Sequence, residues 1–284
     1  MAIRIAVDAG HGSSTAGKRT PPMPKDIDFE KDGIIDVKKG NSIREHWANV
    51  GVAYYVAYYL KKWGFEVVRT GWNDQNSRDD EDTPLWKRQE MIQRKGCLVS
   101  VSCHFNAHGN GQEYTSGRGI ETLMHSIPGN RNKSEELAKA IQTRLVGGTE
   151  QKDRGVRTGN LAMCNAVTME TEASVLCEYA FMTNEEEAAM MGEKSYWKEC
   201  GNETALGIRD YLWSKPTGTI EQATATRAEV IWLQIKLRLA GEDIMTTGIW
   251  DGQTVAAVQS FWMKQRGRSC TGKKVSKDCV KMLA

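Results

Sequence analysis

Short apolar runs alternate with longer amphipathic stretches through the first two thirds of this chain. The runs have the length of buried strands, and they occupy residues 3–8, 65–70, 98–103, 120–124 and 174–181. Between the first two runs, apolar side chains recur every three to four residues over 45–63, and Gly64 follows where a helix would end. This alternation predicts an α/β fold in which a mostly parallel, twisted sheet is flanked by helices.

Local signals mark where further helices begin and end. Ser134 has the side chain of an N-cap before an amphipathic stretch that would stop at Gly147–Gly148. Thr183 and Glu186 have the spacing of a capping box before another helical stretch. We therefore predict one helix that begins after Ser134 and another that begins after Thr183.

The last quarter of the chain has a different pattern. Residues 216–226 are rich in Thr and contain Pro and Gly, which is typical of a linker. Residues 227–284 contain two apolar-striped helical segments and a shorter third one. We predict a large α/β domain over 1–215, a linker over 216–226 and a small, mainly helical domain over 227–284.

Composition and the chain's ends add expectations about where the protein is made. With 284 residues, of which 40% are hydrophobic and 26% charged, the chain can bury a sizeable core. No apolar stretch is long enough to span a bilayer, so we expect no membrane anchor. The N-terminus lacks the basic and apolar segments of a secretion signal, which predicts synthesis in the cytoplasm.

The seven cysteines are predicted to be reduced. An odd number cannot pair completely within one chain, and no CxxC spacing of a cysteine metal cluster occurs. Cys103 and Cys177 adjoin residues discussed below, but neighbouring residues of a strand point to opposite faces of the sheet. We therefore expect these two thiols to pack in the core rather than to bind a ligand.

The small net charge of +2 hides an asymmetry between the two predicted domains. Residues 217–284 hold ten Lys and Arg against six Asp and Glu, and seven of these basic residues lie between Lys264 and Lys281. Such a patch fits an anionic polymer, such as a bacterial wall or a nucleic acid. A solvated protein surface explains it equally well.

Candidate chemistry comes from three distant segments that supply His11, Glu45 and His104. His11 follows the first apolar run, Glu45 opens the helical stretch over 45–63, and His104 follows the run over 98–103. Two His and one Glu are an established ligand set for catalytic zinc, with a fourth position left to water. Because ligand sites gather at the carboxyl ends of parallel strands, His11 and His104 are predicted to share one site.

Two further residues bear on this site. His46 is a rival to Glu45 as a ligand, but neighbouring helix positions diverge by about 100°, so only one of them can face the site. Glu178 lies inside an apolar run, where a carboxylate is costly unless it has chemistry or a partner. The alternatives for Glu178 are a catalytic group and an ion pair with Arg154 or Arg157.

The motifs around these residues resemble the zinc-dependent N-acetylmuramoyl-L-alanine amidases of the Amidase_3 type. The resemblance rests on GHG at His11, Glu45 four residues before Asn49, HFNA at His104 and VLCEYAFMTNEEE around Glu178. DRGVRTGNLAMC at 153–164 is similar to the family's segment before its last strand. The likeness covers roughly residues 3–213, and the long connection at 18–44 departs from the family pattern.

The resemblance implies a function and a role for each residue. It implies that His11, Glu45 and His104 ligate Zn²⁺, that Glu178 is catalytic, and that the substrate is the amide between N-acetylmuramic acid and L-alanine in bacterial peptidoglycan. Polar residues near the predicted site are candidate substrate groups: Asn106, Arg154 and Arg157.

The small domain suggests how such an enzyme would meet its substrate. GIWDGQTVAAVQSFW, with Leu233 and Gln234 before it, resembles the helical peptidoglycan-binding domain family over roughly 227–284. Together with the absence of a secretion signal, this resembles a phage endolysin, which is made in the host cytoplasm and acts on the cell wall after release. A bacterial autolysin or sporulation amidase is the alternative. We expect peptidoglycan as the partner, anionic wall polymers as a further candidate, no nucleic acid, and a monomer.

Two rival classes fit less well. GSSTAGK at 12–18 copies most of a phosphate-binding loop. However, Arg19 stands where Ser or Thr would reach magnesium, and Pro21, Pro22 and Pro24 obstruct the helix that should follow. A catalytically inactive wall-binding protein is the second rival, and the complete candidate ligand set together with Glu178 speaks against it.

Overall fold

A single sheet organises the larger part of the chain in the computed structural model, which describes residues 1–126 and 131–284. Within the described residues, six strands are ordered β2-β1-β3-β6-β4-β5. Their bounds are Arg4–Ala9 (β1), Glu66–Thr70 (β2), Val99–Asn106 (β3), Ile120–His125 (β4), Asp153–Gly159 (β5) and Ala173–Phe181 (β6). The pairs β1–β3, β3–β6 and β4–β5 are parallel, and β4 runs antiparallel to β6. The predicted mostly parallel α/β fold is confirmed.

The central strands are buried along most of their length because both faces of the sheet are covered. β1, β3 and β6 are buried at nearly every position, which is the pattern of strands between two helical layers. β5 is an edge strand with mostly exposed or partly exposed residues. Its sequence lacks an apolar run, so the hydrophobic pattern alone did not predict it as a strand.

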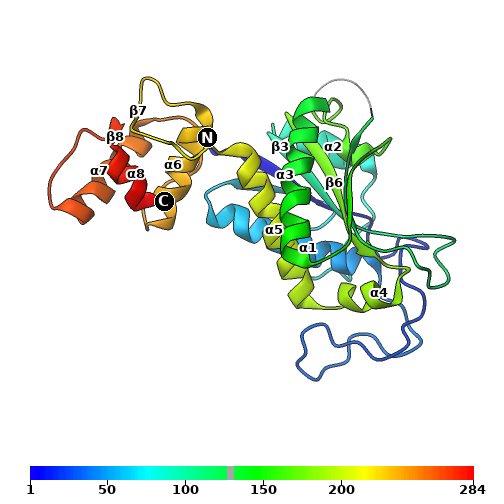
Figure 1. Cartoon of the computed structure of the whole chain (residues 1–284). Helices are drawn as coiled ribbons and strands as arrows, with labels where there is room; N and C mark the ends of the chain where they lie inside the picture. The colour runs from blue at the N-terminus through cyan, green and yellow to red at the C-terminus, as the bar shows by residue number, and fades with distance from the viewer. Residues whose placement is uncertain (127–130) are drawn as a thin grey trace. The chain divides into compact units, whose positions relative to one another are not determined.

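Helices cover the two faces of this sheet (Figure 1). Their bounds are Glu45–Lys62 (α1), Leu85–Arg94 (α2), Arg131–Thr149 (α3), Glu185–Met191 (α4) and Lys194–Leu212 (α5), with a 3₁₀ turn at Ala162–Cys164 (η1). Two glycines let α5 approach its neighbours closely: Gly201 lies against the α1 backbone at Val52, and Gly207 lies against Ile141 of α3. A second small core under α2 and η1 includes Ala6 and Ile92.

Two predicted helix starts are wrong because tertiary contacts use the expected capping groups. Ser134 lies inside α3, and its hydroxyl accepts a hydrogen bond from the backbone N–H of Ser174 on β6. Thr183 accepts hydrogen bonds from the backbone of an incoming loop, including one of 2.8 Å from the N–H of His108. Asn184 therefore caps α4 instead, and its side chain accepts from the N–H of Glu187. The glycines at 147 and 148 lie within α3, so this helix also extends beyond its predicted stop.

The long connection at 18–44 doubles back on itself as an irregular hairpin, seen in blue in Figure 1. Isolated bridges join Arg19 to Arg44 and Ile27 to Val37. The N–H of Glu45 then donates to the carbonyl of Lys18 across 3.0 Å. The insertion therefore returns to its starting point, and α1 begins close to the end of β1.

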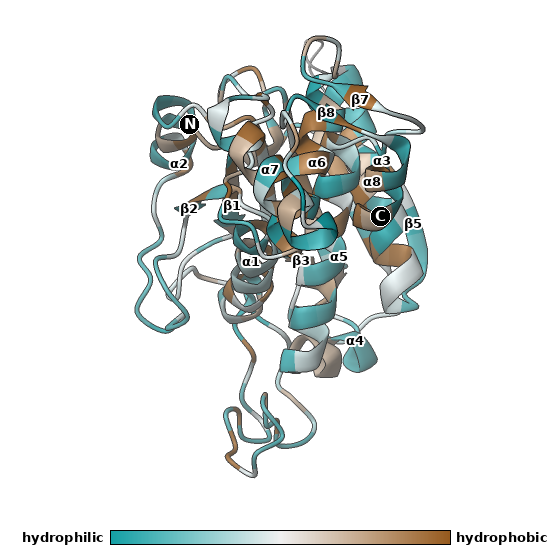
Figure 2. Ribbon diagram, turned by 90° about the vertical axis from the view of Figure 1, so that its left-hand side faces the viewer, coloured by the Kyte–Doolittle hydropathy of each residue, from teal (hydrophilic) through white to brown (hydrophobic). Residues whose placement is uncertain are grey.

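A smaller unit comprises residues 1–3, 60–66 and 209–284. Its helices are α6 (Arg227–Leu239), α7 (Gly252–Arg266) and α8 (Lys277–Leu283), and a short antiparallel ribbon pairs β7 (Ile220–Glu221) with β8 (Lys274–Val275). Figure 2 shows the hydrophobic colouring of α6, whose residues Trp232, Leu233 and Leu237 belong to the core of this unit.

The segment at 216–226 is part of this smaller unit rather than a free linker. Ile220 is buried in the same core, and β7 pairs with β8. The Thr-rich composition suggested a linker, but Ile220 lies in the core of this unit and Ala225 packs against it. Among the described residues, no helix combines the length and apolarity needed to cross a bilayer.

Candidate metal centre

His11 is held in an unusual backbone conformation just beyond β1. Its φ is 64°, in the left-handed region that few residues other than glycine adopt. The Arg88 guanidinium stabilises this turn, since its Nη2 donates to the His11 carbonyl across 2.6 Å and its Nη1 donates to the Ala9 carbonyl across 2.7 Å. The loop thereby directs the His11 ring towards the first turn of α1.

Glu45 is the first residue of α1 and its carboxylate is almost completely buried. Oε1 accepts hydrogen bonds from the N–H of Phe105 at 3.2 Å and from the side-chain amide of Asn49 at 3.3 Å. It also lies 3.0 Å from Nδ1 of His104, while Oε2 lies 3.1 Å from Nε2 of His11. Burial acts to raise the pKa of Glu45, but hydrogen bonds and charge from the two histidines outweigh it and hold this pKa well below its usual range.

His46, the rival ligand, faces away from this site. Its Nδ1 lies 2.7 Å from the carbonyl of Gly10, and its Nε2 lies 3.0 Å from a carboxylate oxygen of Asp80. His46 is buried and engaged at both ring nitrogens. The structure therefore shows that Glu45, and not His46, faces the site, whereas residue type alone allowed either.

His104 approaches the other two residues from β3. Its ring packs edge-on against the His11 ring, with the centroids 4.9 Å apart. A Cβ at Gly10 would overlap the His104 ring, so only glycine permits this approach. Burial lowers the pKa of His104, but the hydrogen bond and charge of Glu45 overcome this effect and raise it overall.

The three side chains form a set that fits a divalent cation. One ligand atom from each of His11, Glu45 and His104 lies within 4.8 Å of the others. The side chains of the two histidines are 18% and 14% exposed, so a cation held there would remain reachable from solvent. Oε2 of Glu45 is buried and faces Nε2 of His11 across 3.1 Å, with no further hydrogen-bond partner among the described groups. A buried carboxylate beside two imidazoles is the donor set that zinc uses.

Glu178 lies next to this set on β6. The strand register places it opposite His104, and its Oε2 atom is buried without a hydrogen-bond partner in the described part of the chain. Removal from solvent, reinforced by the charges of Glu45 and Glu121, raises the pKa of Glu178 to about 8, although His104 opposes the shift. A carboxyl group with a pKa near neutrality can both accept and return a proton.

The candidate substrate residues gather around a carboxylate that the sequence prediction missed. Glu121 on β4 stands opposite Glu178 in the antiparallel pair. Its Oε1 accepts a 2.9 Å hydrogen bond from the Asn106 amide, and its Oε2 lies 2.6 Å from Nε of Arg154 and 3.2 Å from Nε of Arg157. The two arginines therefore pair with Glu121 rather than with Glu178. The sequence could have indicated Glu121, because it is a carboxylate inside an apolar run, as Glu178 is.

A buried ionic network holds the carboxyl end of β1 and the turn that carries His11. Asp8 is fully buried, and its carboxylate accepts hydrogen bonds from Thr70 at 2.9 Å and from Arg88 at 3.1 Å, together with one from Ser102. Arg88 also donates to the Thr83 carbonyl at 2.8 Å. Arg88 thus joins α2 to the turn that carries His11. The sequence placed Asp8 at the end of the first strand, near the predicted site, but it did not single out Arg88 as its partner.

The predicted packing role of the neighbouring thiols agrees with their surroundings. All seven cysteines are free, and Cys103 and Cys177 are fully buried. Burial raises the pKa of Cys103 well above its usual range and that of Cys177 to about 12. Both side chains therefore remain neutral thiols and are poorly suited to bind a cation.

Comparison with known proteins agrees with this geometry. The family model described as N-acetylmuramoyl-L-alanine amidase (Amidase_3) matches residues 5–210. An uncharacterized cell wall amidase from Bacillus anthracis is 31% identical over 226 residues, covering 74% of this chain and 41% of that longer protein. The endolysin of Bacillus phage SPP1 is 25% identical over 217 residues, covering 75% of this chain and 67% of the endolysin.

A solved structure shares the fold of the larger unit. The N-acetylmuramoyl-L-alanine amidase of Clostridium difficile 630 superposes with a TM-score of 0.58 at 25% identity, covering 76% of this chain and 99% of that protein. The family match spans both histidines, Glu45 and Glu178. The chain belongs to the N-acetylmuramoyl-L-alanine amidase (Amidase_3) family.

Proposed function

We propose that this protein is a zinc-dependent hydrolase that cleaves the amide bond between N-acetylmuramic acid and L-alanine in bacterial peptidoglycan. The observation that carries the proposal is the convergence of His11, Glu45 and His104 beside Glu178, whose buried Oε2 atom has no hydrogen-bond partner among the described groups. Family membership supplies the substrate class.

His11, Glu45 and His104 would hold the cation. When bound, Zn²⁺ supplies a Lewis acid that polarises the scissile carbonyl and makes a neighbouring water more acidic. Asn49 and the N–H of Phe105 hold the Glu45 carboxylate through its Oε1 atom, while Oε2 lies beside Nε2 of His11. Such supporting hydrogen bonds orient ligands and strengthen metal binding.

Glu178 is the proposed proton carrier of the reaction. As a carboxylate it accepts a proton from the attacking water, and as a carboxylic acid it returns this proton to the nitrogen of the leaving L-alanine. Three polar side chains surround Glu121, with Asn106 reaching it from β3 and the two arginines from the adjacent strand β5. We assign all three to the substrate: Asn106, Arg154 and Arg157. Each arginine engages Glu121 through Nε, so its remaining N–H groups can donate to carbonyl or carboxylate groups of the stem peptide.

A combined metal and product analysis tests the proposal. Incubation with a zinc chelator should abolish hydrolysis of purified peptidoglycan, and added Zn²⁺ should restore it. Mass spectrometry should find stem peptides with a free L-alanine amino group and glycan strands with intact lactyl carboxyl groups. New reducing sugar ends, or cleavage within the stem peptide, would contradict the assignment.

We further propose that the protein acts as a phage endolysin, made in the host cytoplasm and active on the wall after release. Similarity to the SPP1 endolysin supports this role, whereas similarity to the cell wall amidase of B. anthracis keeps a bacterial autolysin as the alternative. Expression inside a susceptible bacterium distinguishes them. An endolysin should cause lysis only after the membrane is permeabilised, while lysis without permeabilisation would favour an exported autolysin.

The smaller unit is the proposed wall-binding part of the protein. Its basic residues between 264 and 281 suit anionic wall polymers, and the sequence likeness to peptidoglycan-binding domains agrees with this. Binding to the wall would raise the concentration of the enzyme near its substrate. We assign no nucleic acid partner and expect the protein to act as a monomer.

A further inference from the structure

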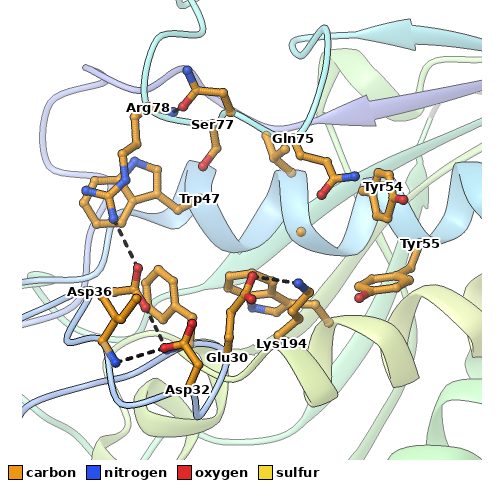
Figure 3. A pocket seen from close by; sticks show the side chains of 16 residues that line it. Glu30, Asp32, Asp36, Trp47, Tyr54, Tyr55, Gln75, Ser77, Arg78 and Lys194 are labelled. Atoms are coloured by element: carbon orange, nitrogen blue, oxygen red, sulfur yellow. Dashed lines mark hydrogen bonds and ion pairs between the residues drawn. The ribbon is translucent and has the colours of Figure 1, made fainter.

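A pocket of about 290 Å³ lies along α1 (Figure 3). Helical spacing puts its α1 residues on the side of the helix away from Glu45. Trp47, Val50, Gly51, Tyr54 and Tyr55 line it, and this spacing places them on one side of the helix. The pocket includes none of the candidate ligands and does not include the side chain of Glu178. This volume lies near the lower end of the range for small-molecule sites, which is about 300 Å³.

Aromatic rings form the wall of this pocket. Trp47, Tyr54 and Tyr55 of α1 and Trp197 of α5 are partly exposed, so portions of their rings face solvent. Phe29 from the 18–44 insertion is buried behind them, with its ring centroid 5.3 Å from that of Trp197. Partly exposed tyrosine and tryptophan rings combine an apolar face with a polar edge, which suits ligands that have both kinds of surface.

The charged groups at the pocket pair with one another. Lys194 lies 2.6 Å from Glu30, and Arg78 lies 3.5 Å from Asp36 and stacks over the Trp47 ring (Figure 3). Asp32 adds a third carboxylate, so the described lining residues carry one more acidic than basic group. Both lining cations are already engaged, so a phosphate or a carboxylate ligand would meet repulsion here.

An uncharged ligand with apolar faces and many hydroxyl groups satisfies these conditions, and a pyranose sugar is such a ligand. Its C–H faces can lie against the aromatic rings, while carboxylates and the polar side chains of Gln75 and Ser77 can bond its hydroxyl and amide groups. We propose that this pocket binds one N-acetylated sugar unit of the glycan strand. The inference rests on the proposed function for the identity of the polymer.

Such a site would give the larger unit a second hold on its substrate. A glycan strand repeats its sugars, so one strand can fill the pocket while another part of the wall occupies the metal centre. Two linked attachment points increase the apparent affinity for the polymer without any new contact at the metal centre. The 18–44 insertion supplies Phe29, Glu30 and Asp36 to the pocket, which gives this unusually long connection a function.

Nuclear magnetic resonance of the full-length wild-type protein tests the location of the site. The probe is chitotetraose, a soluble β-1,4-linked tetramer of N-acetylglucosamine that has no amide to the stem peptide. The indole N–H signals of Trp47 and Trp197 should shift on titration, whereas that of Trp232, buried in the smaller unit, should not. No shift of Trp47 and Trp197, or shifts confined to other tryptophans, would overturn the proposal.

Calorimetric titration with the same probe gives a matched mutational test. Tyr54→Ala should weaken binding about tenfold, because an aromatic stacking face is lost. Tyr58→Ala is the control, since Tyr58 occupies the same helix one turn later, is 50% exposed and does not line the pocket. Equal binding by the two variants, or loss of binding in His11→Ala instead, would place the sugar elsewhere and refute the inference.

The two proposals can fail separately. If the wild-type protein cleaves the peptidoglycan amide but chitotetraose does not engage the pocket, the inference falls and the proposed function stands. If the pocket binds the sugar but no amide is cleaved, the proposed function falls. Because the spectroscopic arm needs no variant, a folding defect in Tyr54→Ala leaves the test intact.

Discussion

Glu178 differs from an ordinary surface glutamate in two ways. Its Oε2 atom is buried without a hydrogen-bond partner in the part of the chain that the structure describes, and burial raises its pKa to about 8. Burying such a group costs free energy, and no neighbouring arginine offsets this cost, because Arg154 and Arg157 pair with Glu121. A residue that the fold keeps in so unfavourable a position is a candidate for function.

Glu178→Gln should therefore retain the fold and the bound zinc but lower turnover by about 10²–10⁴-fold, the usual share of a proton carrier. Amide hydrolysis is measured by the release of L-alanine amino groups, and metal content by mass spectrometry of the purified protein. Glu136→Gln, an exposed change on α3, serves as the control and should leave both unchanged. Undiminished turnover in Glu178→Gln would remove this residue from the mechanism.

Arg88 acts at a distance from the reaction, through the backbone that carries His11. Its Nε, Nη1 and Nη2 atoms donate to carbonyls at Thr83, Ala9 and His11, and lysine cannot reproduce this planar arrangement. Arg88→Lys should weaken zinc binding about 10–100-fold, as expected for a group that orients a metal ligand.

Competition with a chromogenic chelator measures that affinity directly and does not depend on activity. Arg94→Lys, an exposed substitution on the same helix, is the matched control. If both variants bind zinc as tightly as the wild type, the supporting role assigned to Arg88 is wrong.

At the scale of elements, the smaller unit depends on one buried amide in α6. Gln234 is fully buried, and its Oε1 atom accepts hydrogen bonds of 2.9 Å from the N–H groups of Thr247 and Gly248. Its Nε2 donates to the carbonyl of Ile249 and the hydroxyl of Thr254, both at 2.9 Å. One side chain thus fixes the loop that leads into α7.

Gln234→Ala should lower the free energy of unfolding by about 1–3 kcal/mol, because buried backbone N–H groups lose their acceptor. Thermal or urea unfolding followed by tryptophan fluorescence checks this, with the exposed change Gln265→Ala as the control. Hydrolysis of a small soluble muropeptide should persist in the variant. A stability equal to that of the control would contradict the structural role assigned to Gln234.

At the scale of the whole molecule, the distribution of charge separates wall binding from chemistry. Arg268, Lys273 and Lys277 are exposed on the smaller unit, far along the chain from the residues of the metal centre. Long-range attraction between such cations and an anionic polymer is weakened by salt. Their contribution should therefore be visible in wall binding and absent from the cleavage of a small neutral substrate.

Replacing these three residues with Gln should lower the amount of protein that sediments with purified walls about 3–10-fold at low ionic strength. The dependence of this wall binding on salt concentration should also become weaker. Cleavage of a soluble muropeptide should be unchanged. The control replaces Lys87, Lys95 and Lys198, which are exposed on the larger unit, with Gln. If both triple variants bind walls equally well, the basic patch is only a solvated surface.

Much of the fold could be predicted from the sequence because its causes are local. The apolar runs at 3–8 and 98–103 predict central strands that are buried on both faces, and the periodicity over 45–63 predicts α1. The edge strand β5 was not predicted from the hydrophobic pattern, because its residues are mostly exposed and the strand therefore needs no apolar run. The helix starts predicted at Ser134 and Thr183 are wrong because the side-chain oxygen of each residue accepts a hydrogen bond from a distant segment.

The sequence by itself determined the elements and the chemical types available for the site, since His11, Glu45, His104 and Glu178 stand out by residue type and local setting. Only the tertiary structure decided between Glu45 and His46, paired Arg154 with Glu121, and formed the aromatic pocket on α1. The physical reason is that hydrophobic period and capping depend on near neighbours along the chain. Contacts between side chains far apart in sequence depend on strand register and helix packing, which arise only when the whole unit folds.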